Sequence, residues 1–115
     1  MKIWIYYIVE AEKIEIYNRY LSLIRSAAYS GNHRAQFELA LHYEEFNFFG
    51  LNMNYNRRKA MYWYKKACEG NIADACNNLA TCYNSEEKKE EAMAFYKKAI
   101  NLGSILAKKN LRGLL

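Results

Sequence analysis

The chain has 115 residues, of which 52% are hydrophobic and 25% are charged, and it contains no proline and only five glycines. This length corresponds to one domain and excludes a TIM barrel or a full dinucleotide-binding enzyme, while the hydrophobic fraction excludes a disordered chain. The net charge of +5 is concentrated in residues 57–115, which carry twelve basic and six acidic side chains. Such an excess either attracts an acidic partner or forms solvated helix faces.

The N-terminal run of residues 3–9 is apolar at every position, so its pattern does not distinguish a strand, an extra helix turn or a terminal cap. It is too short to span a membrane, and no small-residue cleavage site follows it. We therefore expect a cytoplasmic protein, with a periplasmic or secreted protein as the alternative if an export signal has been removed. An apolar stripe then predicts a helix over residues 12–30. Its members are Ile14, Tyr17, Leu21, Ile24 and Ala28.

Two eight-residue segments, 60–67 and 92–99, are nearly the same. Six of the eight positions are identical, and a seventh exchanges one aromatic residue for another. A second pattern, with apolar residues spaced four and four, occurs three times and lines one face of a helix each time. Its three sets are Ala35, Leu39 and Tyr43; Ala75, Leu79 and Tyr83; and Ala107, Leu111 and Leu115.

Glycines separate the repeated units. We expect Gly31, Gly70 and Gly103 to end helices in the left-handed conformation, where a Cβ is unfavourable. The absence of proline also favours continuous helices. The pattern predicts antiparallel pairs of helices at 33–45 with 57–69 and at 72–84 with 87–102, and a last helix at 104–113. The expected organisation is an N-terminal segment and helix (1–30), two repeats (31–70 and 71–102) and a capping helix (103–115).

These residues resemble Sel1-like repeats, which are solenoid relatives of the tetratricopeptide repeats. The resemblance covers about residues 20–115. It implies an all-α fold, a short right-handed α-solenoid of about two and a half repeats in one domain. The matching positions are Lys59, Ala60, Trp63, Tyr64, Lys66, Ala67, Gly70 and Asn71, followed by Ala75, Leu79 and Tyr83.

The resemblance also implies a scaffold that binds protein partners, because the first helices of such solenoids line a concave groove. By register with the core positions, nine side chains would face this groove. They are Arg34, Phe37, Leu41, Glu44, Asp74, Asn77, Thr81, Asn84 and Lys109. Phe37 and Leu41 have an alternative role, which is contact with the N-terminal helix.

The segment 46–55 contains three phenylalanines within four positions, which are rarely left in water. One interpretation is that they fill the core under a long loop. The other is an exposed aromatic anchor for a partner, formed by Phe48, Phe49 and Tyr55.

Cys68 and Cys76 lie on either side of the turn that holds Gly70, and across a helical hairpin they can approach bridging distance. The placement is similar to the disulfide of cysteine-rich Sel1-like proteins that some bacteria secrete. A cytoplasmic protein would keep both thiols reduced, so their redox state stays open at this point. Cys82 is expected to be a small core residue.

No motif in the sequence indicates catalysis. His33 and His42 are nine residues apart, on opposite sides of a helix, and cannot share a metal. No cysteine pair has zinc-site spacing, and no glycine-rich phosphate loop or nucleophile elbow occurs. We therefore expect a protein that is not an enzyme and that holds no cofactor and no metal.

The sequence is consistent with four functional hypotheses, of which binding of a protein partner is preferred. A narrower version is a bacterial immunity or antitoxin protein that neutralises a toxin. The others are an exported, disulfide-bridged protein and, less favoured, a nucleic-acid-binding repeat with interleaved tyrosines that stack bases. Its basic residues would be Arg57, Arg58, Lys59, Lys88, Lys89, Lys97 and Lys98. A homodimer could also form through the open ends of the solenoid, at residues 3–9 or near Leu111, Leu114 and Leu115.

Overall fold

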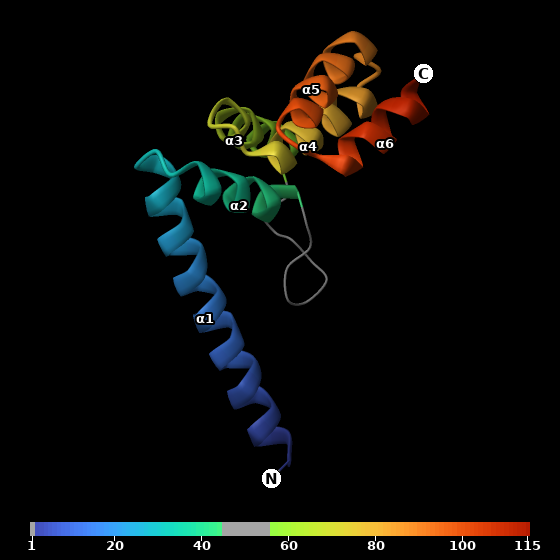
Figure 1. The fold of residues 1–115 in the computed structure, drawn as a ribbon. Coiled ribbons are helices and arrows are strands. Elements are labelled where there is room, and N and C mark those ends of the chain that lie inside the picture. The colour runs from blue at the N-terminus through green and yellow to red at the C-terminus, as the bar shows by residue number, and fades with distance from the viewer. Residues whose placement is uncertain (1, 45–55) are drawn as a thin grey trace.

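The structure, a computed structural model, describes residues 2–44 and 56–115, and within these ranges it consists of six helices without strands (Figure 1). Each helix packs against the next one along the chain. This confirms the predicted all-α solenoid. The helices are α1 (Lys2–Tyr29), α2 (His33–Glu44), α3 (Arg57–Glu69), α4 (Ala73–Ser85), α5 (Lys89–Asn101) and α6 (Ile105–Leu114).

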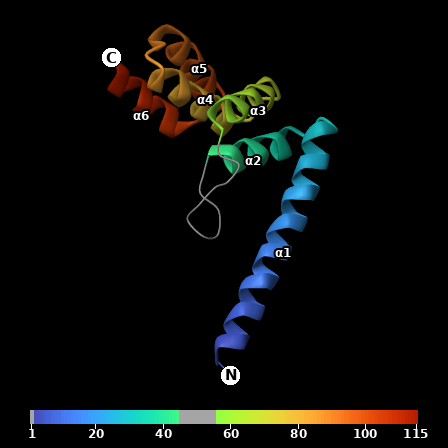
Figure 2. The same ribbon diagram turned by 180° about the vertical axis from the view of Figure 1, so that it is seen from behind.

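Helix α1 begins ten residues earlier than the predicted helix and includes the whole apolar run 3–9. Its C-terminal half packs on α2, whereas its N-terminal half projects from the stack in both Figure 1 and Figure 2. The large apolar side chains of residues 3–9 are 42–73% exposed. The radius of gyration is 16.7 Å, against about 13 Å for a compact domain of this length, so the molecule is elongated.

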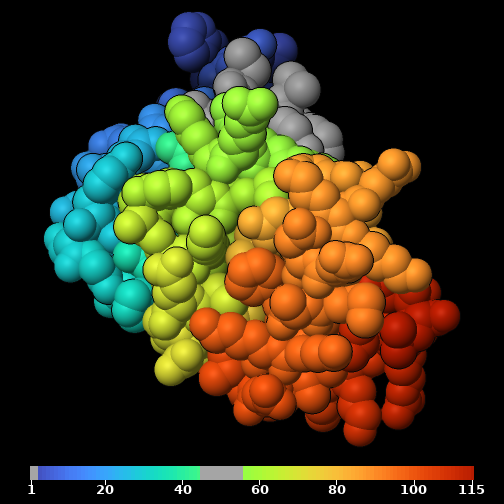
Figure 3. Space-filling view, turned by 90° about the horizontal axis from the view of Figure 1, so that it is seen from above, coloured from blue at the N-terminus to red at the C-terminus, as the bar shows by residue number. Residues whose placement is uncertain are grey.

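The repeated sequence positions form the core. In α3 the residues Ala60, Tyr64 and Ala67 are fully buried, and their counterparts in α5 are buried too. Alanine at the contact positions lets neighbouring helices approach closely, and each tyrosine fills the space between them. The third four-and-four stripe differs at its end, because Leu115 is 82% exposed. Figure 3 shows α3 at the surface between α1 and α5, on the side formed by the second helices of the pairs.

The turns differ from the expectation at one glycine. Gly31 and Gly103 have φ of 97° and 100°, in the left-handed region, but Gly70 has φ of −85° and its neighbour Asn71 takes the left-handed conformation with φ of 65°. Asn71 is therefore the structural counterpart of Gly31 and Gly103. Gly70 has a different role, because a Cβ at this position would collide with the imidazole of His33 at the start of α2.

Side-chain caps fix the starts of three helices. The side-chain oxygens of Asn32, Asn56 and Ser104 accept hydrogen bonds from the backbone N–H three residues later, at 2.9, 3.0 and 3.1 Å. Such caps satisfy one of the donors that a helix leaves free at its first turn. None of the helices in the described ranges is both long and apolar enough to cross a membrane.

Candidate functional site

Five of the predicted groove residues are exposed on the first helices of the pairs. They are Arg34, Asp74, Thr81, Asn84 and Lys109, and we call this set the first-helix face. Arg34 forms an ion pair with Glu38 at 3.6 Å, and its guanidinium lies 5.1 Å from the centre of the Phe37 ring. The Thr81 hydroxyl is hydrogen-bonded to the Tyr96 hydroxyl at 2.8 Å. The remaining three side chains of the face have no ion pair or hydrogen bond within the described ranges.

Phe37 and Asn77 do not lie where the register predicted. Phe37 is 6% exposed and its ring lies 6.0 Å from that of Tyr64. Asn77 is 4% exposed and accepts a hydrogen bond from the Asn110 side-chain amide at 3.0 Å, which ties α4 to α6. Phe37 therefore faces α3 and Asn77 faces α6, so neither side chain points into the solvent. Leu41 is also partly buried against the core.

Glu44, the fourth predicted groove residue of α2, is half-buried in a polar cluster between the two units. Its carboxylate accepts hydrogen bonds from the Tyr64 hydroxyl at 2.7 Å and the Cys82 thiol at 3.2 Å. Burial, and then the nearby Glu44 carboxylate, raises the pKa of Cys82 to about 12 and also raises the pKa of Tyr64 well above its usual range. Both groups therefore stay protonated as donors, and Cys82 is not a reactive thiolate.

Cys68 and Cys76 form a disulfide, with their Cα atoms 4.7 Å apart. The bond joins the end of α3 to the start of α4 and so links the first unit covalently to the second. Cys82 is the free, buried cysteine of the chain. The remaining predicted partner-binding residues, Phe48, Phe49 and Tyr55, lie outside the described residues.

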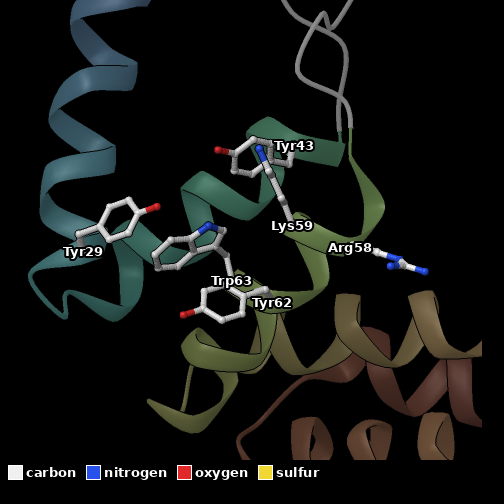
Figure 4. Close-up of a pocket in the computed structure, with 6 residues that line it drawn as sticks. All are labelled: Tyr29, Tyr43, Arg58, Lys59, Tyr62 and Trp63. Atoms are coloured by element: carbon white, nitrogen blue, oxygen red, sulfur yellow. The ribbon is translucent and has the colours of Figure 1, made fainter.

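A cleft opens on the other side of the first unit, between the end of α1 and the exposed side of α3 (Figure 4). Its volume is about 360 Å³. A smaller hollow of about 190 Å³ adjoins it and shares three aromatic residues with it. We call the two together the α1–α3 cleft. Its main side chains are Tyr29, Tyr43, Lys59, Tyr62, Trp63 and Lys66.

Trp63 forms the floor of the cleft and is 5% exposed, whereas Tyr29 and Tyr62 are 73% and 55% exposed. Both tyrosine rings meet the indole edge to face, with centroid distances of 4.9 Å for Tyr29 and 5.1 Å for Tyr62. Figure 4 shows these rings gathered around the indole, while Arg58 points away from them. The arrangement leaves two large aromatic surfaces in contact with solvent above an apolar base.

Two lysine ammonium groups border these rings. Lys59 Nζ lies 5.3 Å from the centre of the Tyr43 ring, and Lys66 Nζ lies 5.2 Å from that of Tyr62. Neither lysine belongs to an ion pair within the described ranges. Neither hollow is lined by an acidic residue of these ranges. The cleft is therefore positively charged and aromatic among the described residues, a composition suited to binding.

Sequence reasoning did not identify this cleft, although it carried a signal. Lys59, Tyr62 and Lys66 are spaced i, i+3 and i+7 and therefore share one helix face. In the sequence, Lys59 had been assigned to a basic cluster with Arg57 and Arg58 under the nucleic-acid hypothesis. The contribution of Tyr29 depends on how α1 packs, which no local pattern reveals. Among the described residues, no group of three or more His, Cys, Asp or Glu side chains could hold a metal ion.

The profile of the Sel1 repeat family matches residues 33–72 and 73–104. The chain is similar to a Sel1 repeat protein from Oxalobacter formigenes, with 31% identity, a TM-score of 0.66, and coverage of 81% of this chain and 70% of that one. It is also similar to a protective antigen of uropathogenic Escherichia coli strains with an SLR fold, with 32% identity and a TM-score of 0.70 over 79% of this chain. The match spans only 20% of the antigen. A search of curated protein sequences gave no significant match.

Proposed function

The chain belongs to the Sel1 repeat family, and from this premise we propose that it is a non-catalytic module that binds a protein partner through the first-helix face. Sel1 repeats in general mediate protein–protein interactions as helical scaffolds. The observation that carries the proposal is the exposure of Arg34, Asp74, Asn84 and Lys109 along α2, α4 and α6. These side chains differ in charge from one helix to the next, so a row of them can select a partner by electrostatic complementarity.

A charge-reversal variant tests this surface. The variant Arg34→Glu, Asp74→Lys, Lys109→Glu changes the net charge by −2, and Lys65→Glu on α3 changes it by the same amount away from the face. Both variants and the wild type are used to capture partners from the native cell, with chemical cross-linking and mass spectrometry. We expect the triple variant to lose a partner that Lys65→Glu retains. Equal capture by all three proteins would reject the first-helix face as the binding surface.

We also propose that the protein works in an oxidising compartment, the periplasm or the extracellular space. The support is the Cys68–Cys76 disulfide, because the reducing cytosol keeps thiols free. Protein isolated from the native cell under rapid alkylation should show one reactive thiol, that of Cys82, after unfolding. Three reactive thiols would place the protein in a reducing compartment.

A further inference from the structure

The α1–α3 cleft has the size of a site for one or two side chains. Its larger part, about 360 Å³, lies within the range of ligand pockets and is too small to enclose a folded partner. The buried Trp63 gives it an apolar floor, and Tyr29 and Tyr62 give it two exposed aromatic walls. Tyrosine and tryptophan at such positions supply large contact areas at low entropic cost. We call the space between the Tyr29 and Tyr62 rings the aromatic slot. A large apolar or aromatic side chain is its complementary occupant.

The positive charges beside the slot favour carboxylates on either side of the bound side chain. Lys59 and Lys66 lie seven residues apart on α3, which places their backbones about 10.5 Å apart along the helix axis. Tyr62 stands between them on the same helix face. Each ammonium lies over an aromatic ring, and its remaining donors are free to bind a carboxylate. The cleft therefore presents one cation on each side of an aromatic slot.

The second unit shows that the fold does not require Lys59 and Tyr62, although Lys66 recurs there as Lys98. The α3 residues Lys59 and Tyr62 correspond in α5 to Glu91 and Ala94, thirty-two residues later. The buried alanines and the buried tyrosine of the two helices are the same over this interval. A residue kept for packing would be expected to recur with the core. Lys59 and Tyr62 do not recur, so their presence in the first unit requires another reason.

We propose that the α1–α3 cleft binds an acidic peptide segment of a partner protein, with an aromatic or large apolar side chain between Tyr29 and Tyr62 and flanking carboxylates on Lys59 and Lys66. Carboxylate–ammonium contacts supply charge-assisted hydrogen bonds, and the rings supply apolar contact. A nucleic acid is the poorer match. A strand needs a continuous basic track along several nucleotides, whereas the three cations of this cleft, Arg58, Lys59 and Lys66, come from one helix and border one slot. The site is separate from the first-helix face and does not depend on it.

A pooled library of synthetic heptapeptides, with two glutamates on each side of a varied three-residue centre, provides the probe. Binders are selected on immobilised protein, and isothermal titration calorimetry then measures their affinities. We expect the selected centres to be rich in aromatic residues, and replacement of the glutamates by glutamine to weaken binding roughly tenfold or more. Binding should also weaken as the salt concentration rises.

Variants that carry the residues of the second unit test the contributions of Lys59 and Tyr62 to binding while preserving the fold. Tyr62→Ala and Lys59→Glu introduce the residues that α5 tolerates at the corresponding positions. We expect each to weaken the selected peptides roughly tenfold, while Lys65→Glu, which makes the same change of charge as Lys59→Glu but outside the cleft, changes affinity less than about twofold. Circular dichroism and unfolding midpoints should match those of the wild type and so separate binding from folding.

Three outcomes would overturn the proposal. One is a library without any member that binds above the glutamine-substituted background. Another is a set of binders whose affinity does not change with Tyr62→Ala or Lys59→Glu. The last is a mixed-sequence single-stranded oligonucleotide that binds more tightly than every peptide and depends on the same two residues. A result on the first-helix face leaves this test unaffected, because none of its residues lines the cleft.

Discussion

The unit of α2 and α3 and the unit of α4 and α5 share their buried alanines, leucines and central tyrosine but differ in their surfaces and in one aromatic position, Trp63 or Phe95. The buried alanines and tyrosines recur, whereas Lys59 and Tyr62 are replaced by Glu91 and Ala94. The aromatic contacts differ accordingly. Trp63 is covered at its edges by two tyrosines, whereas Phe95 stacks on Tyr83 with a centroid distance of 5.5 Å and an interplanar angle of 11°. The recurring positions thus determine the fold, and the positions that do not recur distinguish one unit from the other in binding.

The largest expected difference between the units concerns their central aromatic residues. Trp63 is 5% exposed, whereas Phe95 is only half-buried. We expect Trp63→Ala to lower the free energy of unfolding by about 3–5 kcal/mol and Phe95→Ala to lower it by less. Trp63→Phe, which copies the second unit, should cost less than Trp63→Ala because it keeps an aromatic ring on the floor of the cleft. Urea unfolding followed by circular dichroism measures all three. Equal losses for the two alanine variants would show that the cores of the units are energetically equivalent.

The second difference is the disulfide. The junction of α3 and α4, which we call the first junction, has one, whereas the junction of α5 and α6, the second junction, does not. The positions that correspond to Cys68 and Cys76 at the junction of α5 and α6 are Ile100 and Lys108. The variant Cys68→Ser, Cys76→Ser should lose about 2.5 kcal/mol, through the larger entropy of its unfolded chain. Dithiothreitol should lower the urea midpoint of the wild type to that of the variant and leave the variant unchanged. A wild type that does not respond to dithiothreitol would contradict this expectation.

The glycine at the first junction gives a smaller contrast. Gly70 packs against His33, whereas the second junction carries Leu102 at the corresponding place before its left-handed residue. Gly70→Ala should cost about 1–3 kcal/mol, because the new methyl group must displace the imidazole. Combined with His33→Ala, the same substitution should cost much less. Thermal unfolding of the two single variants and the double variant measures the coupling. Additive losses would mean that the contact with His33 does not constrain Gly70.

The smallest expected difference is a dependence on pH. His42 in the first unit corresponds to Cys82 in the second. Burial, and then the nearby Arg25, lowers the pKa of His42 below its ordinary value of 6.5. Protonation therefore favours the unfolded chain, so this contribution to stability is present above pH 6.5 and is lost as the pH falls through and below that value. Cys82, with a pKa of about 12, does not titrate there.

The measurement compares unfolding midpoints at pH 7.5 and pH 5.5. His42→Phe should show a smaller decrease between the two values than the wild type. The hydrogen bond between the Tyr17 hydroxyl and His42 Nδ1 is lost in the variant at both values, so the comparison uses the slope and not the absolute stability. A slope identical to that of the wild type would assign the acid sensitivity to other groups.

The sequence alone was sufficient to predict the helices that belong to the repeats. The four-and-four stripes predicted α2, α4 and α6, and the duplicated octapeptide predicted α3 and α5, because burial of one helix face imposes that spacing. The run 3–9 could not be assigned in this way. It is apolar at every position, so the period that separates a helix from a strand is absent.

The site was harder to predict than the fold. Register alone could not show that Phe37 and Asn77 face neighbouring helices, because this depends on the angle at which the first helices pack. The cleft brings Tyr29 to Trp63, thirty-four residues later in the chain and beyond the whole of α2. Glycine spacing also misassigned one turn, since asparagine can adopt the left-handed conformation and does so at Asn71.

The two tryptophans occupy opposite ends of the range of exposure. Trp4, on the projecting half of α1, is 73% exposed, and Trp63 is 5% exposed under the tyrosines of the cleft. The intrinsic fluorescence of the chain is therefore the sum of a solvated and a shielded indole. Iodide will quench mainly the red-shifted emission of Trp4, and any partner that covers α1 will protect it. The blue-shifted emission of Trp63 will respond instead to occupancy of the cleft, so a single spectrum separates events on the projecting half of α1 from events in the cleft.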